Sequence, residues 1–195
     1  SSTEVGKQLI IYDIINSPSV FDVAWDNENG QNDLMMPLQS AQEKADTELL
    51  SFYFNSLTHQ SADHAAKSPI HQLFYHRLRG GRLCGFCGHP GEGGREQREW
   101  AGGSYSVQEL WEAQWEINGQ RYTETLEMII RRAITVLYPA QSSVSIIGHG
   151  DAHNGNVFFQ EHGKDYSLLY FDPAYAGQHS PLLDLAKPLF HNVFV

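Results

Sequence analysis

Residues 144–186 read VSIIGHGDAHNGNVFFQEHGKDYSLLYFDPAYAGQHSPLLDLA and carry the clearest structural pattern in the chain. A short apolar run at residues 144–147 predicts a buried strand, and a polar cluster follows it directly at residues 149–156. Polar loops that follow a buried strand often carry function, because the rigid scaffold positions their side chains. This loop is therefore the first candidate for a site.

Two more strand-like runs follow at residues 157–159 and 166–171, and the polar residues between them indicate a β-hairpin. In an antiparallel pair, the residue before the first strand and the residue after the second lie at the same end, with facing Cα atoms about 5 Å apart. We therefore expect Asn156 and Asp172 to be neighbours. An amide oxygen beside a carboxylate supplies the hard ligands that Mg²⁺ accepts. Asp151, on the same loop as Asn156, can approach that pair without being a ligand.

The spacing of these residues resembles the catalytic loop of kinases. His149-x-Asp151-x-x-x-x-Asn156 has the spacing of that loop, and Asp172 stands where the kinase fold keeps its second metal ligand. The form HGD, with FDPA downstream, is more similar to the aminoglycoside phosphotransferase and choline kinase group than to protein kinases, which have HRD and DFG. The close resemblance covers residues 146–190.

The resemblance implies a role for each matching residue. Asp151 would be the catalytic residue that orients or deprotonates the substrate hydroxyl, and Asn156 and Asp172 would hold Mg²⁺. His149 would be a structural residue that supports the loop. Asp184, in the run LLDLA, resembles the aspartate that hydrogen-bonds the catalytic-loop backbone in relatives. The implied reaction is transfer of the γ-phosphoryl group of ATP to a hydroxyl group of a small molecule, with ATP and Mg²⁺ as cofactors.

The resemblance also implies an α+β fold, the mainly helical C-terminal lobe of a protein-kinase-like fold, in which the small β-hairpin carries the active site. Residues 1–17 would form the end of an N-terminal-lobe strand and the hinge, where backbone groups near Asp13 and Ile15 bind adenine, and residues 18–195 would form the lobe itself. An N-terminal β lobe with its phosphate-covering loop and lysine is missing from the sequence. We therefore expect a chain truncated at both ends, which can be inactive even if its parent is a kinase.

Local patterns predict the remaining elements. Ser106 and Glu109 form a capping box for a short helix through Trp115, Asn118-Gly119 favours a turn, and the β-branched residues at 6–15 favour a strand. Apolar residues recur at helical spacing in three segments: residues 44–60, 68–78 and 123–138.

Residues 80–104 are rich in glycine and predict a long loop or an insert. Cys84, Cys87 and His89 in this segment suggest half of a zinc site, but tetrahedral zinc needs four ligands and only histidines elsewhere could complete the set. Two incidental thiols are the simpler interpretation. With only two cysteines, the chain has no disulfide framework.

The composition limits the kinds of partner that we expect this protein to bind. A formal net charge of −10 argues against a nucleic-acid surface and mildly favours a cationic acceptor, such as an amino sugar, an amino alcohol or a choline-like amine; a neutral sugar also fits. No apolar run is long enough for a membrane helix and no signal-peptide pattern is present, so we expect a cytoplasmic protein without membrane contact. The oligomeric state is open.

Two alternatives to a kinase are compatible with the sequence. A catalytically inactive kinase-like binding module would keep the fold and a nucleotide or partner surface. A metallophosphoesterase is the weaker alternative, because GHGDAHNGN superficially resembles the Gly-Asp and Gly-Asn-His boxes of that class, but the early Asp-x-His box that such enzymes need does not precede residue 146.

Overall fold

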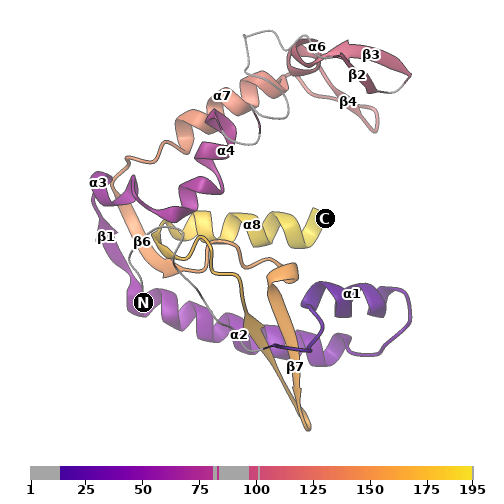
Figure 1. Ribbon diagram of the computed structural model, residues 1–195, viewed down its shortest axis with the longest axis vertical. Coiled ribbons are helices and arrows are strands. Elements are labelled where there is room, and N and C mark those ends of the chain that lie inside the picture. Colours follow the sequence, from indigo (N-terminus) through magenta and orange to yellow (C-terminus); the bar gives the residue numbers. More distant parts are fainter. Residues whose placement is uncertain (1–13, 81–82, 84–96, 101, 195) are drawn as a thin grey trace. The chain divides into compact units, whose positions relative to one another are not determined.

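The computed structural model describes residues 14–80, 83, 97–100 and 102–194 of the 195-residue chain (Figure 1). The protein has mixed α and β structure. It divides into two compact units, the first built from residues 1–47 and 154–171 and the second from residues 48–153 and 172–195. Each unit therefore combines segments that are far apart in the sequence.

The first unit packs helices against a β-hairpin. It contains α1 (Val20–Glu28), the beginning of α2 (Met35–Ser56), the short 3₁₀ helix η2 (Asn154–Asn156) and the antiparallel strands β7 (Val157–His162) and β8 (Asp165–Tyr170). The buried core of this unit joins the helices to β7 through Val20, Val23, Leu38, Ala41, Val157 and Phe159.

The second unit is organised around a three-stranded antiparallel sheet. Its strands are β1 (Thr58–Gln60), β6 (Ser143–Gly148) and β9 (Gly177–His179), in the order β1-β6-β9. The middle strand, β6, is the most protected, with Ile146 1% exposed, and α8 (Pro181–Phe194) packs against it. The polar loop that follows β6 is thus anchored on a buried strand.

The rest of the second unit consists of short helices and two small hairpins. They are α3 (Ala62–Ala65), η1 (Pro69–Gln72), α4 (Tyr75–Arg79), α6 (Val107–Glu112), α7 (Leu126–Val136), β2 (Gln97–Trp100) with β3 (Gly103–Ser106), and β4 (Glu116–Ile117) with β5 (Gln120–Arg121).

Several local predictions are confirmed. Ser106 and Glu109 form the expected capping box, although the helix ends at Glu112 rather than at Trp115. Asn118 and Gly119, with φ values of 53° and 78°, form the turn between β4 and β5.

Other boundaries differ from the prediction where packing overrides periodicity. Residues 68–78 form η1 and α4 instead of one helix, because Phe74 (φ −106°, ψ −83°) leaves the helical region and directs Tyr75 into the core. The helix predicted at residues 44–60 begins at Met35 and ends at Ser56, and β1 takes its last residues.

The N-terminal and Gly-rich predictions are tested only in part. Residues 6–13 of the predicted strand, including Asp13, lie outside the described residues, but Ile14 and Ile15 belong to no strand and Ile14 is 89% exposed. A buried strand reaching residue 15 is therefore wrong. Within residues 80–104, β2 and the start of β3 form a hairpin where a loop was predicted, while Cys84, Cys87 and His89 lie outside the described residues.

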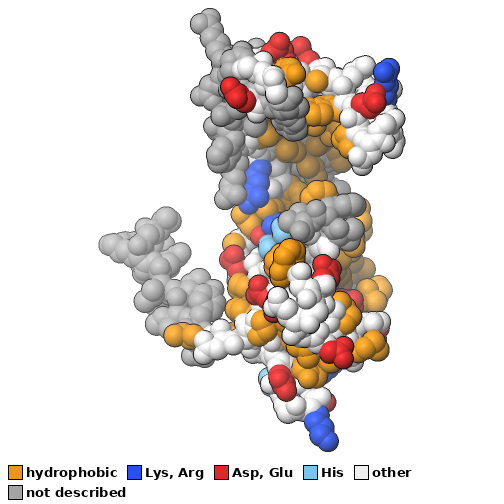
Figure 2. Space-filling model, turned by 90° about the vertical axis from the view of Figure 1, so that its right-hand side faces the viewer, with side chains coloured by type: hydrophobic (Ala, Val, Ile, Leu, Met, Phe, Trp, Pro, Cys, Tyr) orange, Lys and Arg blue, Asp and Glu red, His pale blue; other side chains and the backbone are white. Residues whose placement is uncertain are grey.

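Many hydrophobic side chains are exposed, and several are visible on the face drawn in Figure 2. None of the residues of α7 is buried, and Leu182 of α8 is 75% exposed. Within the described part of the chain, no helix is both long and apolar enough to cross a membrane.

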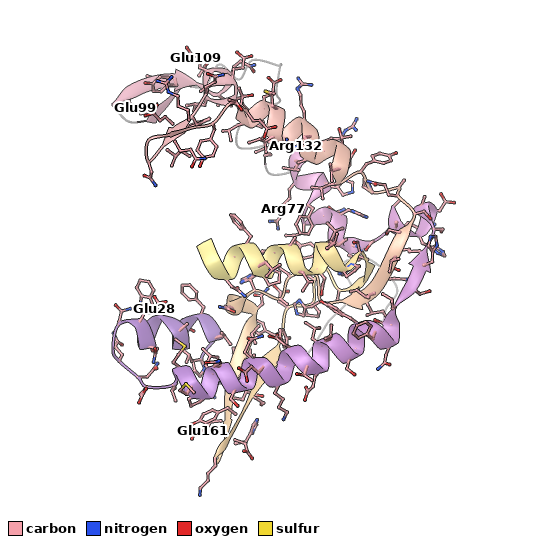
Figure 3. The ribbon with its side chains drawn as sticks, turned by 180° about the vertical axis from the view of Figure 1, so that it is seen from behind. Glu28, Arg77, Glu99, Glu109, Arg132 and Glu161 are labelled. Atoms are coloured by element: carbon pink, nitrogen blue, oxygen red, sulfur yellow. The ribbon has the colours of Figure 1, made fainter. Side chains whose placement is uncertain are left out.

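The β7–β8 hairpin is longer than predicted and has a different register. A two-residue turn at Gly163-Lys164 joins the strands, and Glu161, labelled in Figure 3, lies near this exposed end. Val157 pairs with Tyr170, so Phe171 is opposite Asn156 and donates its backbone N–H to the Asn156 carbonyl at 3.0 Å. The expected register, with Asp172 opposite Asn156, is therefore off by one residue.

Candidate functional site

The loop that begins at His149 leaves β6 through two glycine positions that tolerate no side chain. A Cβ atom on Gly148 would lie 2.5 Å from the Asp184 carboxylate. Gly150 has a φ of 82°, and a Cβ atom there would lie 2.7 Å from the Tyr175 carbonyl oxygen. The pattern Gly-His-Gly thus lets the loop backbone approach both α8 and the segment before β9.

Asp184 of α8 is the anchor of this loop. Its side chain is 2% exposed and accepts hydrogen bonds from Gly150 N at 2.6 Å, from His179 Nε2 at 2.9 Å and from the Tyr53 hydroxyl. Burial by itself raises the pKa of Asp184, but these three donors outweigh it and hold the pKa below its ordinary value. A buried, ionised carboxylate therefore fixes the loop backbone in place.

Asp151 lies against a lysine of the same helix. The Asp151 residue is 8% exposed, and its Oδ1 forms an ion pair with Lys187 Nζ. The backbone N–H of Asp151 donates to His149 Nδ1 at 3.3 Å, so the His149 ring supports the loop conformation. Asp151 is thus held in place by contacts of both its backbone and its side chain.

His153 completes the polar cluster. Its Nε2 lies 3.9 Å from Asp151 Oδ1, and its ring stacks on His191 with the centroids 4.2 Å apart. Burial lowers the pKa of His153, the nearby Lys187 and His191 charges lower it further, and Asp151 raises it by less. His153 is therefore a neutral imidazole at neutral pH, and Lys187 is the cation that Asp151 meets.

One face of α8 makes all three contacts to the loop. Asp184, Lys187 and His191 are spaced by three and four residues, which places them on the same side of a helix. They meet Gly150, Asp151 and His153 in chain order. Sequence reasoning identified Asp184 but missed Lys187 and His191, although this spacing from Asp184 was the signal that could have found them.

The segment before β9 approaches the loop from another direction. Tyr175, whose carbonyl lies beside Gly150, accepts a hydrogen bond at its hydroxyl from Arg77 Nη2 at 3.2 Å. Arg77 belongs to α4 and is labelled in Figure 3. The loop thus contacts α8 directly, and Tyr175 links it to Arg77 of α4.

The predicted metal ligands belong to different units. Asn156 ends η2 in the first unit and is partly exposed, whereas Asp172 is exposed, has a φ of 57° and belongs to the second unit. The described residues contain no group of three or more His, Cys, Asp or Glu side chains that could hold a metal ion. A pair made of one amide and one carboxylate falls outside that criterion, so their shared Mg²⁺ site stays a prediction.

The hinge assignment likewise stays a prediction. Ile15 lies in irregular, partly exposed backbone, and Asp13 is outside the described residues. Comparison of the whole sequence and structure with known proteins found no matching family model, no matching curated protein and no matching solved structure. The function must therefore be argued from the loop itself.

Proposed function

We propose that this chain is the catalytic lobe of an ATP- and Mg²⁺-dependent phosphotransferase that acts on a hydroxyl group of a small molecule. The observation that carries the proposal is the nearly buried Asp151 carboxylate, held beside Lys187 on a loop that resembles the catalytic loop of aminoglycoside and choline kinases. A rigidly placed carboxylate suits the positioning of a substrate hydroxyl.

In this reaction Asp151 of the loop and the α8 residues Lys187 and Asp184 have separate tasks. Asp151 accepts the hydrogen bond of the acceptor hydroxyl and takes its proton as the oxygen attacks the γ-phosphorus, while the bond from that phosphorus to the β–γ bridging oxygen breaks and ADP leaves. Lys187 lies where its charge can attract phosphate oxygens beside Asp151. Asp184 keeps the loop backbone fixed while these contacts form.

The side-chain oxygens of Asn156, which is partly exposed, and of Asp172, which is exposed, have the donor chemistry that suits Mg²⁺. The ion, when bound, neutralises charge on the phosphates of ATP. These two side chains would hold the ion, so Asp151 is not needed as one of its ligands.

Calorimetric titration of ATP into this chain, with and without Mg²⁺, tests the proposal. We expect binding that requires Mg²⁺ and weakens by about tenfold or more in Asp172→Ala and Asn156→Ala, since each removes a ligand of the ion. Asp165→Ala, which removes an exposed carboxylate on β8, should leave binding unchanged. Nucleotide binding that ignores Mg²⁺ and both ligand variants would contradict the phosphotransferase and favour a binding module.

The role of Asp151 needs a second measurement. Asp151→Asn keeps the shape of the side chain and should abolish phosphoryl transfer to hydroxyl acceptors while ATP binding persists. Transfer at the unchanged rate in Asp151→Asn would remove this residue from the reaction.

A further inference from the structure

The charged groups around the Asp151 loop do not suit the cationic acceptor that the net charge favoured. Asp184 contributes one carboxylate to this region, but its side chain is 2% exposed and accepts three hydrogen bonds, one of them from Gly150 N. A substrate ammonium group would have to replace these donors in a buried position, which costs free energy. Asp184 is therefore not a binding group for a cation.

Asp151 already has a cation beside it. Its Oδ1 atom is buried and forms an ion pair with Lys187 Nζ. The Lys187 side chain is 21% exposed, so its charge also repels a second cation that approaches from the solvent. A neutral hydroxyl group meets no such repulsion and can use the other oxygen of the carboxylate. Asp151 thus suits the hydroxyl group of an acceptor better than an ammonium group.

Arg77 of α4 brings a second positive charge toward the same loop. Its Nη2 donates to the Tyr175 hydroxyl at 3.2 Å, and within the described part of the chain its guanidinium group makes no ion pair with a carboxylate. Tyr175 in turn borders the loop, because its carbonyl oxygen would lie 2.7 Å from a Cβ atom on Gly150. Arg77 is only partly buried, so its other N–H donors can bind a ligand (Figure 3).

Arginines of other elements have carboxylate partners. These pairs are Arg121 with Glu116, Arg131 with Glu127, and Arg132 with Glu124. Arg77 and Arg79 of α4 instead donate to tyrosine hydroxyl groups, although the chain has 23 acidic and 13 basic residues. Among the described residues, the positive charge of α4 therefore has no paired carboxylate.

We infer that the phosphate acceptor is a polyhydroxylated anion, which places a hydroxyl group at Asp151 and a carboxylate or phosphate group at Arg77. This inference rests on the proposed phosphotransferase function and specifies its acceptor. The planar guanidinium group of arginine can bind either kind of anion through two parallel hydrogen bonds. Arg77 is then a specificity residue that takes no part in the bond changes.

The contacts of Tyr175 indicate the size of the acceptor. Arg77 contacts the hydroxyl end of this side chain, and Gly150 lies against its backbone end. The anionic group and the reacting hydroxyl of the acceptor are therefore several bonds apart, which favours a sugar acid or a sugar phosphate over a small hydroxy acid. The transfer itself is unchanged: the acceptor oxygen bonds to the γ-phosphorus, its proton passes to Asp151, and ADP leaves.

Three ligands with the same carbon skeleton and different charges test the inference. They are D-gluconate, which is anionic, D-sorbitol, which is neutral, and D-glucamine, which is cationic at neutral pH. Each is titrated into the isotope-labelled chain without nucleotide, at constant low ionic strength, and the backbone amide signals are followed. We expect gluconate to shift the signals of Gly150 and Tyr175 and to bind at least about tenfold more tightly than sorbitol, with glucamine the weakest.

Sorbitol 6-phosphate distinguishes the two kinds of anion in the same assay. Tighter binding of this ligand than of gluconate identifies a sugar phosphate as the acceptor class. Tighter binding of gluconate identifies a sugar acid. Both results support an anionic acceptor.

Variants of Arg77 locate the anion. Arg77→Met removes the charge but keeps most of the stem, and it should weaken gluconate binding by about tenfold or more without changing sorbitol binding. Arg77→Lys should restore part of the gluconate affinity, because it restores the charge but not the planar fork. Arg121→Met, in the hairpin of β4 and β5, is the matched control and should bind gluconate like the parent chain. If Arg77→Met does not fold, the comparison of the three ligands on the parent chain still decides.

Three results would overturn the inference. Glucamine binding that equals or exceeds gluconate binding would restore a cationic acceptor, and the absence of binding by all four ligands would remove the site. Gluconate affinity that is unchanged in a folded Arg77→Met variant would remove Arg77 from recognition.

Failure of the phosphotransferase function gives a different pattern. Gluconate or sorbitol 6-phosphate would then bind through Arg77, but incubation with Mg²⁺ and radiolabelled ATP would yield no phosphorylated ligand. That pattern would keep the anion site and overturn its role as the acceptor site.

Discussion

Asp184 remains charged in a buried position because the surrounding donors favour the ionised form. Its pKa is lowered in the folded protein, so its contribution to stability is complete above the unfolded-state value of about 3.9 and is lost as the pH falls through the lowered folded value. Asp184→Asn should reduce the free energy of unfolding at pH 7 by about 2–3 kcal/mol, because hydrogen bonds to a charged acceptor are lost.

Urea unfolding of Asp184→Asn between pH 7 and pH 3 measures this effect. The deficit relative to the parent chain should shrink only below about pH 4, where the Asp184 carboxylate becomes protonated in the unfolded chain while it is still ionised in the fold. Asp165→Asn, at an exposed position, should unfold like the parent over the whole range. A deficit for Asp184→Asn that is constant down to pH 3 would contradict the lowered pKa.

Lys187 and Asp151 should depend on each other energetically. Their side chains are 21% and 11% exposed, so either charge without its partner is poorly hydrated. Lys187→Met and Asp151→Asn should each lower the free energy of unfolding, and the double variant should lose less than the sum of the two by about 1–2 kcal/mol. Urea unfolding of the parent chain, the two single variants and the double variant measures this coupling energy.

Lys164→Met serves as the control for the lysine, because Lys164 lies in the exposed turn between β7 and β8. It should change stability by less than about 0.5 kcal/mol. Strict additivity of Lys187→Met and Asp151→Asn would mean that their ion pair contributes nothing in solution.

At the level of residues, the sequence predicted the loop and Asp184 but not the cation beside Asp151. The short motif around Asp151 predicted the loop, and the family resemblance predicted that Asp184 hydrogen-bonds the backbone of this loop. Lys187 and His191 carry no motif of their own. Their contacts with the loop arise because α8 places them on the same face as Asp184 and packs this face against the loop.

Among the elements, the junction between β6 and the loop imposes the strongest local constraint. Gly150→Ala should destabilise the protein by about 2–4 kcal/mol, since a Cβ atom there meets the Tyr175 carbonyl and the φ of 82° is unfavourable for alanine. Thermal unfolding followed by circular dichroism measures the loss.

Gly163→Ala is the matched control for this prediction. Gly163 has a similar φ of 72°, but nothing lies within 4 Å of an added Cβ atom. In this variant only the backbone conformation is unfavourable, so the free energy of unfolding should fall by about 1 kcal/mol. If both variants lose the same stability, the close approach of Tyr175 to Gly150 does not contribute to the destabilisation of Gly150→Ala.

Elements defined by local chemistry were predicted well, and those defined by packing were not. The capping box of α6 and the turn at Asn118-Gly119 depend on residues within a few positions of each other. At the break between η1 and α4, the backbone of Phe74 leaves the helical region, and the ring of the next residue, Tyr75, packs edge-on against Tyr138 with centroids 6.0 Å apart. Such a contact between distant residues is not readable from periodicity.

Across the whole molecule, the division into units could not be predicted from the sequence. The first unit joins residues 1–47 to residues 154–171, and its core brings Val20 and Val23 together with Val157 and Phe159. The apolar run at residues 157–159 predicted a strand, but it did not say which helix packs against that strand. The predicted α+β class is compatible with the structure, while the kinase-like lobe stays a proposal.

The protein as a whole should lose stability in mild acid, because His71 and His153 are held neutral in the fold. Burial lowers the pKa of His71, and its hydrogen bond to Ala65 raises that pKa by less, while burial and Lys187 lower the pKa of His153. Both histidines are therefore neutral in the fold and take up protons more readily when unfolded. Their contribution is complete above about pH 6.5 and is lost as the pH falls through the lowered folded values.

Urea unfolding at pH values from 7.5 to 5 should show this loss, with a slope of at most about 1.4 kcal/mol per pH unit for each proton taken up. His71→Gln removes one titrating group and should flatten the slope, whereas His64→Gln, at an exposed position, should leave it unchanged. A free energy of unfolding that stays constant between pH 7.5 and 5 would contradict the buried neutral state of both rings. The window lies above that of Asp184, so a two-stage acid profile would separate the histidines from the carboxylate that anchors the loop.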